Sequence, residues 1–169
     1  QYWNQTINTA LSPLLVAPNV TTGGTILWMP NEKLQIIGMV GTITDTSNRS
    51  GFNDFDDGLY GTIIFTYQYQ LAELPGGLVF MPGYGWDRDF TELDGRINID
   101  EGQLVPTTKD DTWFFSASFW QYLWTKQAVK QQPIDVNDGR QDLQGVGVFL
   151  RLQTADPDAN PLDYSITGG

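Results

Sequence analysis

The residues best suited to chemistry are acidic, and they gather in two short stretches. Asp54, Asp56 and Asp57 lie close together, and Asp156 is followed by Asp158. Carboxylate oxygens are the ligands that Ca²⁺ prefers, so either stretch could bind that cation, although the first lacks the ligand spacing of an EF-hand loop. Paired carboxylates also hydrolyse glycosidic bonds. These carboxylates fall in turn-rich segments and not at a cleft, so a solvated loop is the simpler interpretation and we expect no catalytic residue.

The rest of the composition narrows the chemistry further. The 169-residue chain contains no His and no Cys, which removes the commonest general base, the commonest metal ligand and any thiolate nucleophile. It has 20 acidic and 9 basic residues, and a net charge of −11 repels the phosphate backbone of nucleic acids. We therefore expect a protein that is not an enzyme, needs no cofactor and binds no nucleic acid.

Aromatic residues form the second group of candidates. Trp113, Trp120, Tyr122 and Trp124 fall within one short segment. An indole ring can stack on the apolar C–H face of a sugar, whereas at a membrane surface Trp and Tyr anchor a protein at the level of the headgroups. Both roles stay open for Trp120. Trp124 and Tyr69 lie near segment ends and fit the anchoring role better.

Arg151 is the one charged residue inside the alternating segment 145–154. A guanidinium that faces lipid at mid-depth costs ~2–4 kcal/mol, so we expect Arg151 to face water. There its planar donor group could hold paired sugar hydroxyls or form an ion pair with a loop carboxylate, and both interpretations stay open.

The elements that must position these residues are antiparallel strands. Residues 1–22 have an irregular pattern, and from residue 23 onward the sequence predicts a single all-β unit of about seven strands and no helix. The predicted strands are 25–30, 34–45, 59–71, 78–86, 110–125, 145–154 and 162–167, with Pro82-Gly83 interrupting the fourth. The predicted short turns are 31–33, 75–77 and 156–161, and the long connections are 46–58, 87–109 and 126–144.

The lengths of these connections alternate between short and long. An up-and-down membrane barrel has short turns at one rim and long loops at the other. We therefore expect the three long connections at one end of the sheet and the short turns at the opposite end.

The two faces of the predicted strands differ in polarity, because side chains alternate across a strand. The outward, apolar set is Phe65, Phe115, Ala117, Phe119, Val146, Val148 and Leu150, and the inward set is Thr62, Thr66, Gln68, Ser116, Ser118, Trp120, Arg151 and Gln153. A soluble sheet with one wet face gives the same alternation. Two details favour a membrane wall: the polar face carries Thr, Ser and Gln where a soluble sheet shows Lys and Glu, and the charges lie mostly in connections.

Four segments, taken together and in order, resemble the carbohydrate-selective porin family of the OprB type. They are 34–57 with its loop SNRSGFNDFDDG, TELDGR at 91–96, DDTWFFSASFWQYLW at 110–124, and GVGVFLRLQTADPDANPLDYSITGG at 145–169. The resemblance implies an antiparallel up-and-down transmembrane β-barrel of sixteen strands in the bacterial outer membrane. This chain would supply about seven of those strands, with the remainder beyond Gly169.

The same resemblance implies passive diffusion of sugars and other small solutes, including ions, through a homo-trimer surrounded by outer-membrane lipid. The lumen would then be lined by the inward set named above, with Arg151 at its narrow part. The alternative is a soluble secreted β-sandwich that binds glycans on an aromatic face.

Overall fold

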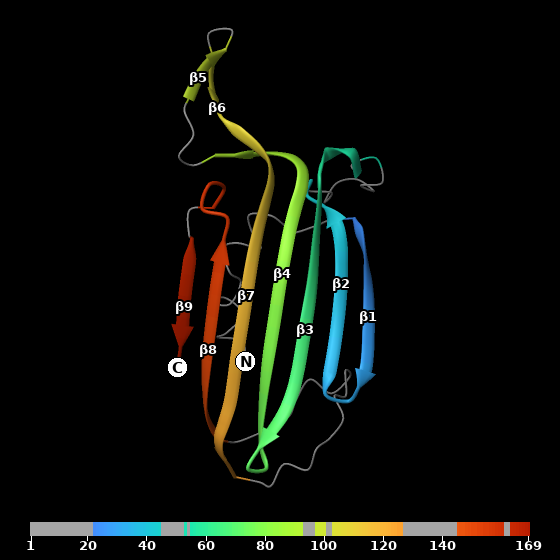
Figure 1. Cartoon of the computed structure of the whole chain (residues 1–169), viewed down its shortest axis with the longest axis vertical. Helices are drawn as coiled ribbons and strands as arrows, with labels where there is room; N and C mark the ends of the chain where they lie inside the picture. The colour runs from blue at the N-terminus through green and yellow to red at the C-terminus, as the bar shows by residue number, and fades with distance from the viewer. Residues whose placement is uncertain are drawn as a thin grey trace.

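The computed structural model describes residues 22–44, 53, 55–92, 97–100, 103–126, 145–160 and 163–169. Its main feature is one seven-stranded antiparallel sheet with the strand order β1-β2-β3-β4-β7-β8-β9 (Figure 1). The strands are β1 (Gly23–Asn31), β2 (Leu34–Thr42), β3 (Leu59–Leu71), β4 (Leu74–Thr91), β7 (Thr108–Thr125), β8 (Gly145–Ala155) and β9 (Tyr164–Gly168). The predicted all-β, up-and-down sheet is confirmed. The described sheet is open, with β1 and β9 as its edges.

Several predictions lie outside the described residues. They are the irregular segment 1–21, most of the connection 46–58 including Asp54, most of the connection 126–144, and the predicted start of the last strand at Leu162. Within 55–58 the chain forms a short 3-10 helix, η1 (Phe55–Asp57).

The connection predicted at 87–109 is more structured than its polar composition suggested. Strand β4 continues to Thr91, and the small hairpin β5 (Ile97–Asp100) and β6 (Gln103–Pro106) follows before β7 begins. Figure 1 shows this hairpin projecting beyond one end of the sheet. Strand β4 runs through Pro82, which pairs with Phe115 of β7, while the pairing with β3 skips Met81 and Pro82. The Pro82 carbonyl oxygen accepts a 2.7 Å hydrogen bond from the Thr62 hydroxyl of β3.

The turn between β3 and β4 lies at Ala72 and Glu73, so the prediction of a turn at 75–77 is wrong. Both residues have positive φ, 51° and 65°. This is the backbone of a two-residue hairpin turn whose twist matches that of the strands it joins. The prediction rested on the turn-like composition of Pro75, Gly76 and Gly77, but all three residues pair with β3.

Gly76 and Gly77 serve ring packing instead of a turn. A Cβ built on Gly76 would lie 2.7 Å from the Tyr69 ring, and one on Gly77 would lie 2.5 Å from the indole nitrogen of Trp120. Glycine is therefore the residue that lets these two aromatic rings lie flat against the backbone of β4.

The prediction that all long connections share one end of the sheet is wrong. Thr125 pairs with Gly145 at the end of the sheet where β3 turns into β4, so the connection 126–144 starts and finishes there (Figure 1). The connections after β2 and β4 leave from the opposite end, and so does the short turn after β8. The reason is geometric: in a meander each successive connection changes ends whatever its length. The strands still follow one another up and down, but the different lengths of the connections are not evidence for this topology.

Candidate pore wall

The strand register assigns the predicted residues to their faces. Residues directly opposite each other in neighbouring strands point to the same side. One such row crosses the sheet as Gln35, Thr66, Val79, Ser118, Arg151 and Thr167. We call the side on which this row lies the Arg151 face. The predicted inward residues Thr66, Ser118 and Arg151 are therefore neighbours at one level of the wall.

The other predicted inward residues lie on the same face in adjacent rows. Ser116 is opposite Gln153, and Gln68 is opposite Gly77, which is in turn opposite Trp120. Thr62 lies in a further row nearer the β5–β6 end, between Met39 of β2 and Gly83 of β4. From Thr62 to Gln68 is six residues, or about 20 Å along the strand at ~3.3 Å per residue.

Hydrogen bonds between side chains join these rows over β7, β8 and β9. Arg151 donates from Nε to Ser118 Oγ at 2.9 Å. Gln153 donates from Nε2 to Ser116 Oγ at 3.3 Å and accepts from the Ser165 hydroxyl at 3.0 Å. This part of the wall is therefore a continuous surface of hydroxyl, amide and guanidinium groups, the chemistry that matches the hydroxyls of a sugar.

The Arg151 face is not uniformly polar. Over β2, β3 and β4 it carries Ile37, Ile64, Val79 and Met81. Near the β5–β6 end it carries a small buried core of Tyr60, Phe114 and Ala155 with Ile43, and Met81 and Phe90 pack against this core. The polar part of the wall is thus concentrated on β7–β9, a grouping that the alternation within single strands could not predict.

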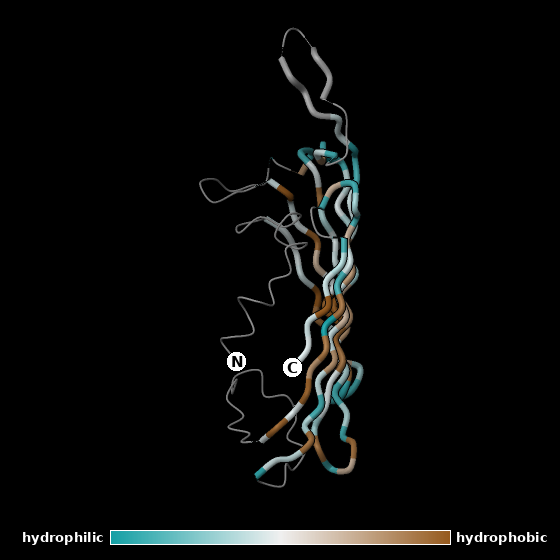
Figure 2. The backbone as a smooth tube through the Cα atoms, turned by 90° about the vertical axis from the view of Figure 1, so that its left-hand side faces the viewer, coloured by the Kyte–Doolittle hydropathy of each residue, from teal (hydrophilic) through white to brown (hydrophobic). Residues whose placement is uncertain are grey.

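The opposite side of the sheet, which we call the apolar face, carries all seven predicted outward residues. One row runs Trp28, Ile36, Phe65, Phe80, Ala117, Leu152 and Ile166. Several of its members are well exposed, with Ile166 at 68% and Trp28 at 61%. Figure 2 shows the sheet edge-on as a single layer, with hydrophobic residues frequent at mid-height. The predicted division of faces, with Leu150 and Arg151 on opposite sides, is consistent with this register.

Aromatic side chains flank the apolar face at two levels. At the upper level Trp113 lies opposite Tyr84, whose ring stacks on Trp86 at 6.2 Å between centroids. At the lower level Tyr67 stacks on Tyr69 at 6.3 Å. Tyr67 is opposite Leu78, so the two levels are separated along β4 by residues 78–84, about 20 Å at ~3.4 Å per residue. Apolar side chains between two aromatic levels are typical of the outer surface of a membrane barrel, whose apolar band is about 25 Å tall across its tilted strands.

The glycines of β1–β3 create an apolar groove on this face. Its volume is about 680 Å³, and its lining includes Gly38 and Gly61 with the side chains of Ile26, Val40 and Ile63. Most of the lining is apolar, and the hydroxyl of Tyr84, which also lines the groove, donates to Asp111, so we assign the groove to the apolar face and not to the candidate site.

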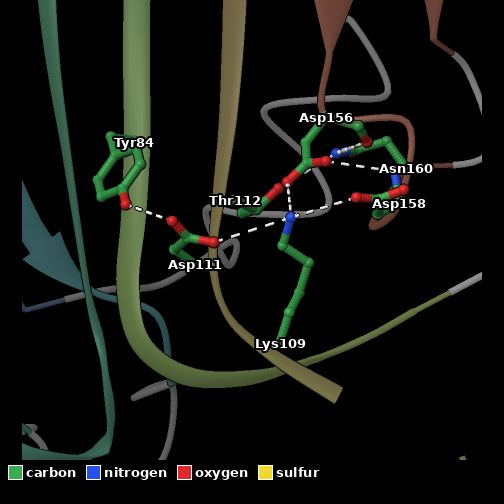
Figure 3. A network of polar contacts seen from close by, with 7 residues as sticks. All are labelled: Tyr84, Lys109, Asp111, Thr112, Asp156, Asp158 and Asn160. Carbon is green, nitrogen blue, oxygen red and sulfur yellow. Dashed lines mark hydrogen bonds and ion pairs between the residues drawn. The ribbon is translucent and has the colours of Figure 1, made fainter. Parts of the chain in front are cut away.

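A network of polar contacts lies at the end of the sheet nearest the β5–β6 hairpin (Figure 3). The Lys109 ammonium lies 2.8 Å from Asp156, 3.6 Å from Asp158 and 3.8 Å from Asp111. The hydrogen bond to Asp156 raises the pKa of Lys109 above its usual value. Lys109 sits beyond the upper aromatic level, so this cluster ties the start of β7 to the β8–β9 turn at the rim.

The rest of the β8–β9 turn is held by hydrogen bonds. Asn160 is buried and donates to Thr112 Oγ1 at 3.3 Å and to the Asp156 carbonyl oxygen at 3.1 Å. On the other side of Lys109, the Tyr84 hydroxyl donates to Asp111. The network therefore links β4, β7 and the turn.

The network bears on the Ca²⁺ hypothesis. The carboxylates of Asp156 and Asp158, which the sequence analysis considered as Ca²⁺ ligands, instead contact the Lys109 ammonium. Asp56 and Asp57 lie on η1 and are exposed, and Asp54 is outside the described residues. Among the residues that the structure describes, no group of three acidic side chains is arranged to hold a metal ion.

Comparison with protein-family models, with curated proteins and with solved structures finds no match to this chain. No helix within the described part of the chain is long and apolar enough to cross a membrane.

Proposed function

We propose that this chain forms part of the wall of an outer-membrane β-barrel through which sugars and other small solutes diffuse. One observation carries the proposal. A single layer of strands presents an exposed apolar face between two aromatic levels, and the opposite face carries hydrogen-bonded Arg151, Ser116, Ser118 and Gln153.

The apolar face supports contact with lipid. Large side chains such as Ile63, Phe80 and Leu152 are more than 40% exposed, and the described residues provide no second layer over them. Burying one such side chain is worth ~1.5–3 kcal/mol, so leaving a whole face in water would cost far more than a domain's usual stability of about 5–15 kcal/mol. Hydrocarbon removes that cost.

The Arg151 face supports passage of polar solutes. A sugar presents many hydroxyls, and the face offers donors and acceptors at several successive levels. Arg151 is the one charged side chain that the strands place on this face between the Thr62 and Gln68 rows. Its guanidinium suits paired hydroxyls, and its charge opposes cations in an otherwise strongly acidic protein.

A secreted glycan-binding β-sandwich remains the second candidate, because it too has one polar and one apolar face. A sandwich buries its apolar face under a second sheet. The described residues supply one large sheet and only the small β5–β6 hairpin besides, so the barrel wall is favoured. Sixteen strands, a homo-trimer and the outer membrane stay predictions.

Phase partition and reconstitution test the proposal together. A membrane barrel should enter the detergent phase, migrate faster on SDS gels before heating than after, and make liposomes permeable to small sugars. A protein that stays in the aqueous phase and leaves liposomes sealed would support the sandwich.

A further inference from the structure

We propose that the apolar groove over β1–β4 holds an acyl chain of a phospholipid whose headgroup carries a primary ammonium group, as in phosphatidylethanolamine, and that carboxylates at the adjacent rim select this headgroup. The inference rests on the proposed membrane wall, because the groove faces lipid only if the sheet lies in a bilayer. It assigns a lipid site to the apolar face, whereas solutes pass along the Arg151 face.

Glycines create the groove by leaving neighbouring positions of β1, β2 and β3 without side chains. Gly24 and Gly61 both lie opposite Val40, and Gly38 lies opposite Ile63, so all three glycines are on the apolar face. A Cβ built on Gly24 or Gly38 would have no atom within 4 Å. The wall therefore contains a hollow of about 680 Å³ that its own side chains do not fill.

The groove lies at the depth of the hydrocarbon and ends at the upper aromatic level. Its lining runs from Ile26 and Ile63, on the side toward the middle of the wall, to the stacked rings of Tyr84 and Trp86. Inside a bilayer the association of apolar surfaces depends on close packing, because lipid tails are as apolar as the protein. A flexible acyl chain meets this requirement, since it can follow an open apolar surface, and its headgroup then lies at the level of Tyr84 and Trp86.

The polar network of Figure 3 begins where the groove ends. The Tyr84 hydroxyl, at the end of the groove, donates to Asp111. The Lys109 ammonium lies within 3.8 Å of the carboxylates of Asp111, Asp156 and Asp158. Three carboxylates around one ammonium leave an excess of negative charge. The side chains of Asp111 and Asp158 are 49% and 65% exposed, so both are open to a further cation.

The rest of this rim is acidic as well. Arg88 joins Lys109 as a described cation, whereas η1, the end of β4 and the start of β7 add the carboxylates Asp56, Asp57, Asp87, Asp89 and Asp110. Any phospholipid can place an acyl chain in the groove, so the headgroup determines which lipid binds. This rim repels an anionic headgroup and attracts an exposed ammonium group, which can also donate hydrogen bonds to the carboxylates.

A second copy of the chain fits the groove less well. Two copies that lie in one membrane with the same orientation place their rims at the same height. Contact through the groove would then bring the two acidic rims together, and like charges at close range oppose association. The acyl chain of a lipid with a cationic group meets no such repulsion.

Native mass spectrometry of the full-length protein tests the lipid site. After incubation with equal amounts of phosphatidylethanolamine and phosphatidylglycerol that carry the same acyl chains, the protein released from mild detergent should retain one phospholipid. We expect the ethanolamine lipid to exceed the glycerol lipid about two- to fivefold, the range that one exposed ion pair supplies. Equal retention of the two lipids, or no retained lipid, would overturn the inference.

Two variants locate the chain and the headgroup. Gly38→Phe places a ring in the open space of the groove and should remove most of the retained lipid, whereas Leu152→Phe changes the apolar face outside the groove and should not. Asp111→Asn keeps an acceptor for the Tyr84 hydroxyl but loses the charge, so the preference for the ethanolamine lipid should disappear. Asp57→Asn makes the same change of charge on η1 and should leave the preference intact.

The remaining outcomes separate the lipid site from a second copy and from the pore. A change of oligomeric state in Gly38→Phe without loss of lipid would assign the groove to a second copy and overturn the inference. A protein that conducts sugar but shows no lipid preference contradicts the lipid site alone. A protein that retains the ethanolamine lipid but conducts no sugar contradicts the pore alone.

Discussion

An arginine on the apolar face should destabilise the folded protein in a bilayer according to its depth. Leu152 lies between the two aromatic levels, nearer the lower one, in the row of Phe65, Phe80 and Ala117, and is 43% exposed. On the lipid face of a barrel, arginine costs ~2–4 kcal/mol at the midplane and ~0–1 kcal/mol near the interfaces. We therefore expect Leu152→Arg to lower the folding equilibrium constant about 30-fold to 700-fold relative to Leu152→Ala, since every 1.4 kcal/mol is tenfold.

Two further variants make this measurement specific to a membrane. Trp113→Arg, compared with Trp113→Ala, changes the apolar face at the upper aromatic level and should cost at most about 1 kcal/mol. Gln153→Arg, on the Arg151 face of the same strand as Leu152, should cost little relative to Gln153→Ala, because both lose the hydrogen bonds with Ser116 and Ser165 and the arginine faces water. The assay is reversible folding into lipid vesicles from urea, followed by tryptophan fluorescence and gel mobility.

Equal losses for Leu152→Arg and Trp113→Arg would refute the reasoning, because a dry core under a second layer shows no such dependence on height. Equal losses for Leu152→Arg and Gln153→Arg would refute the assignment of faces.

Two further predictions concern packing and the rim. Gly83→Ala should destabilise by ~1–3 kcal/mol in equilibrium unfolding, because a Cβ there would overlap the ring of buried Phe114, whereas Gly24→Ala has open space and should not. Lys109→Met should destabilise by ~1–3 kcal/mol, because it leaves the buried carboxylate of Asp156 without its cation, and adding Asp156→Asn should recover part of the loss. Because the pKa of Lys109 is raised in the folded state, its contribution should be full below the usual lysine value and fade as the pH rises above it, which unfolding at several alkaline pH values would reveal.

Local pattern predicted much of the sheet. Strand β3 has the predicted bounds, Leu59–Leu71, because β-branched and aromatic residues make up most of it. Alternation also assigned the predicted residues to faces, because odd-numbered and even-numbered residues of a strand lie on opposite sides of the sheet. The strand register then determines which of the two sets in each strand shares a side with the sets of its neighbours.

The failures have a common physical origin in contacts between strands. Pro75, Gly76 and Gly77 have the composition of a turn, but the rings of Tyr69 and Trp120 need glycine there. Loop length could not place the connection 126–144, because its end of the sheet depends on the number of strands before it.

The Lys109 cluster was missed for the same reason. Its members come from β7 and from the β8–β9 turn, and no local pattern joins them. The signal that could have found the cluster is a lone lysine next to two aspartates, followed by an aspartate-rich turn two strands later.

Measuring sugar flux through the full-length protein with Arg151 substituted tests the central claim most directly. Reconstituted in planar bilayers and liposomes, Arg151→Ala should stay folded, change the rate of sugar entry and raise the preference for cations, because it removes a positive charge from the wall. Arg151→Lys should keep the ion selectivity near that of the original protein and still alter sugar entry, since an ammonium lacks the planar donor pair. If Arg151→Ala leaves both sugar flux and ion selectivity unchanged, the Arg151 face does not line the narrow part of a pore.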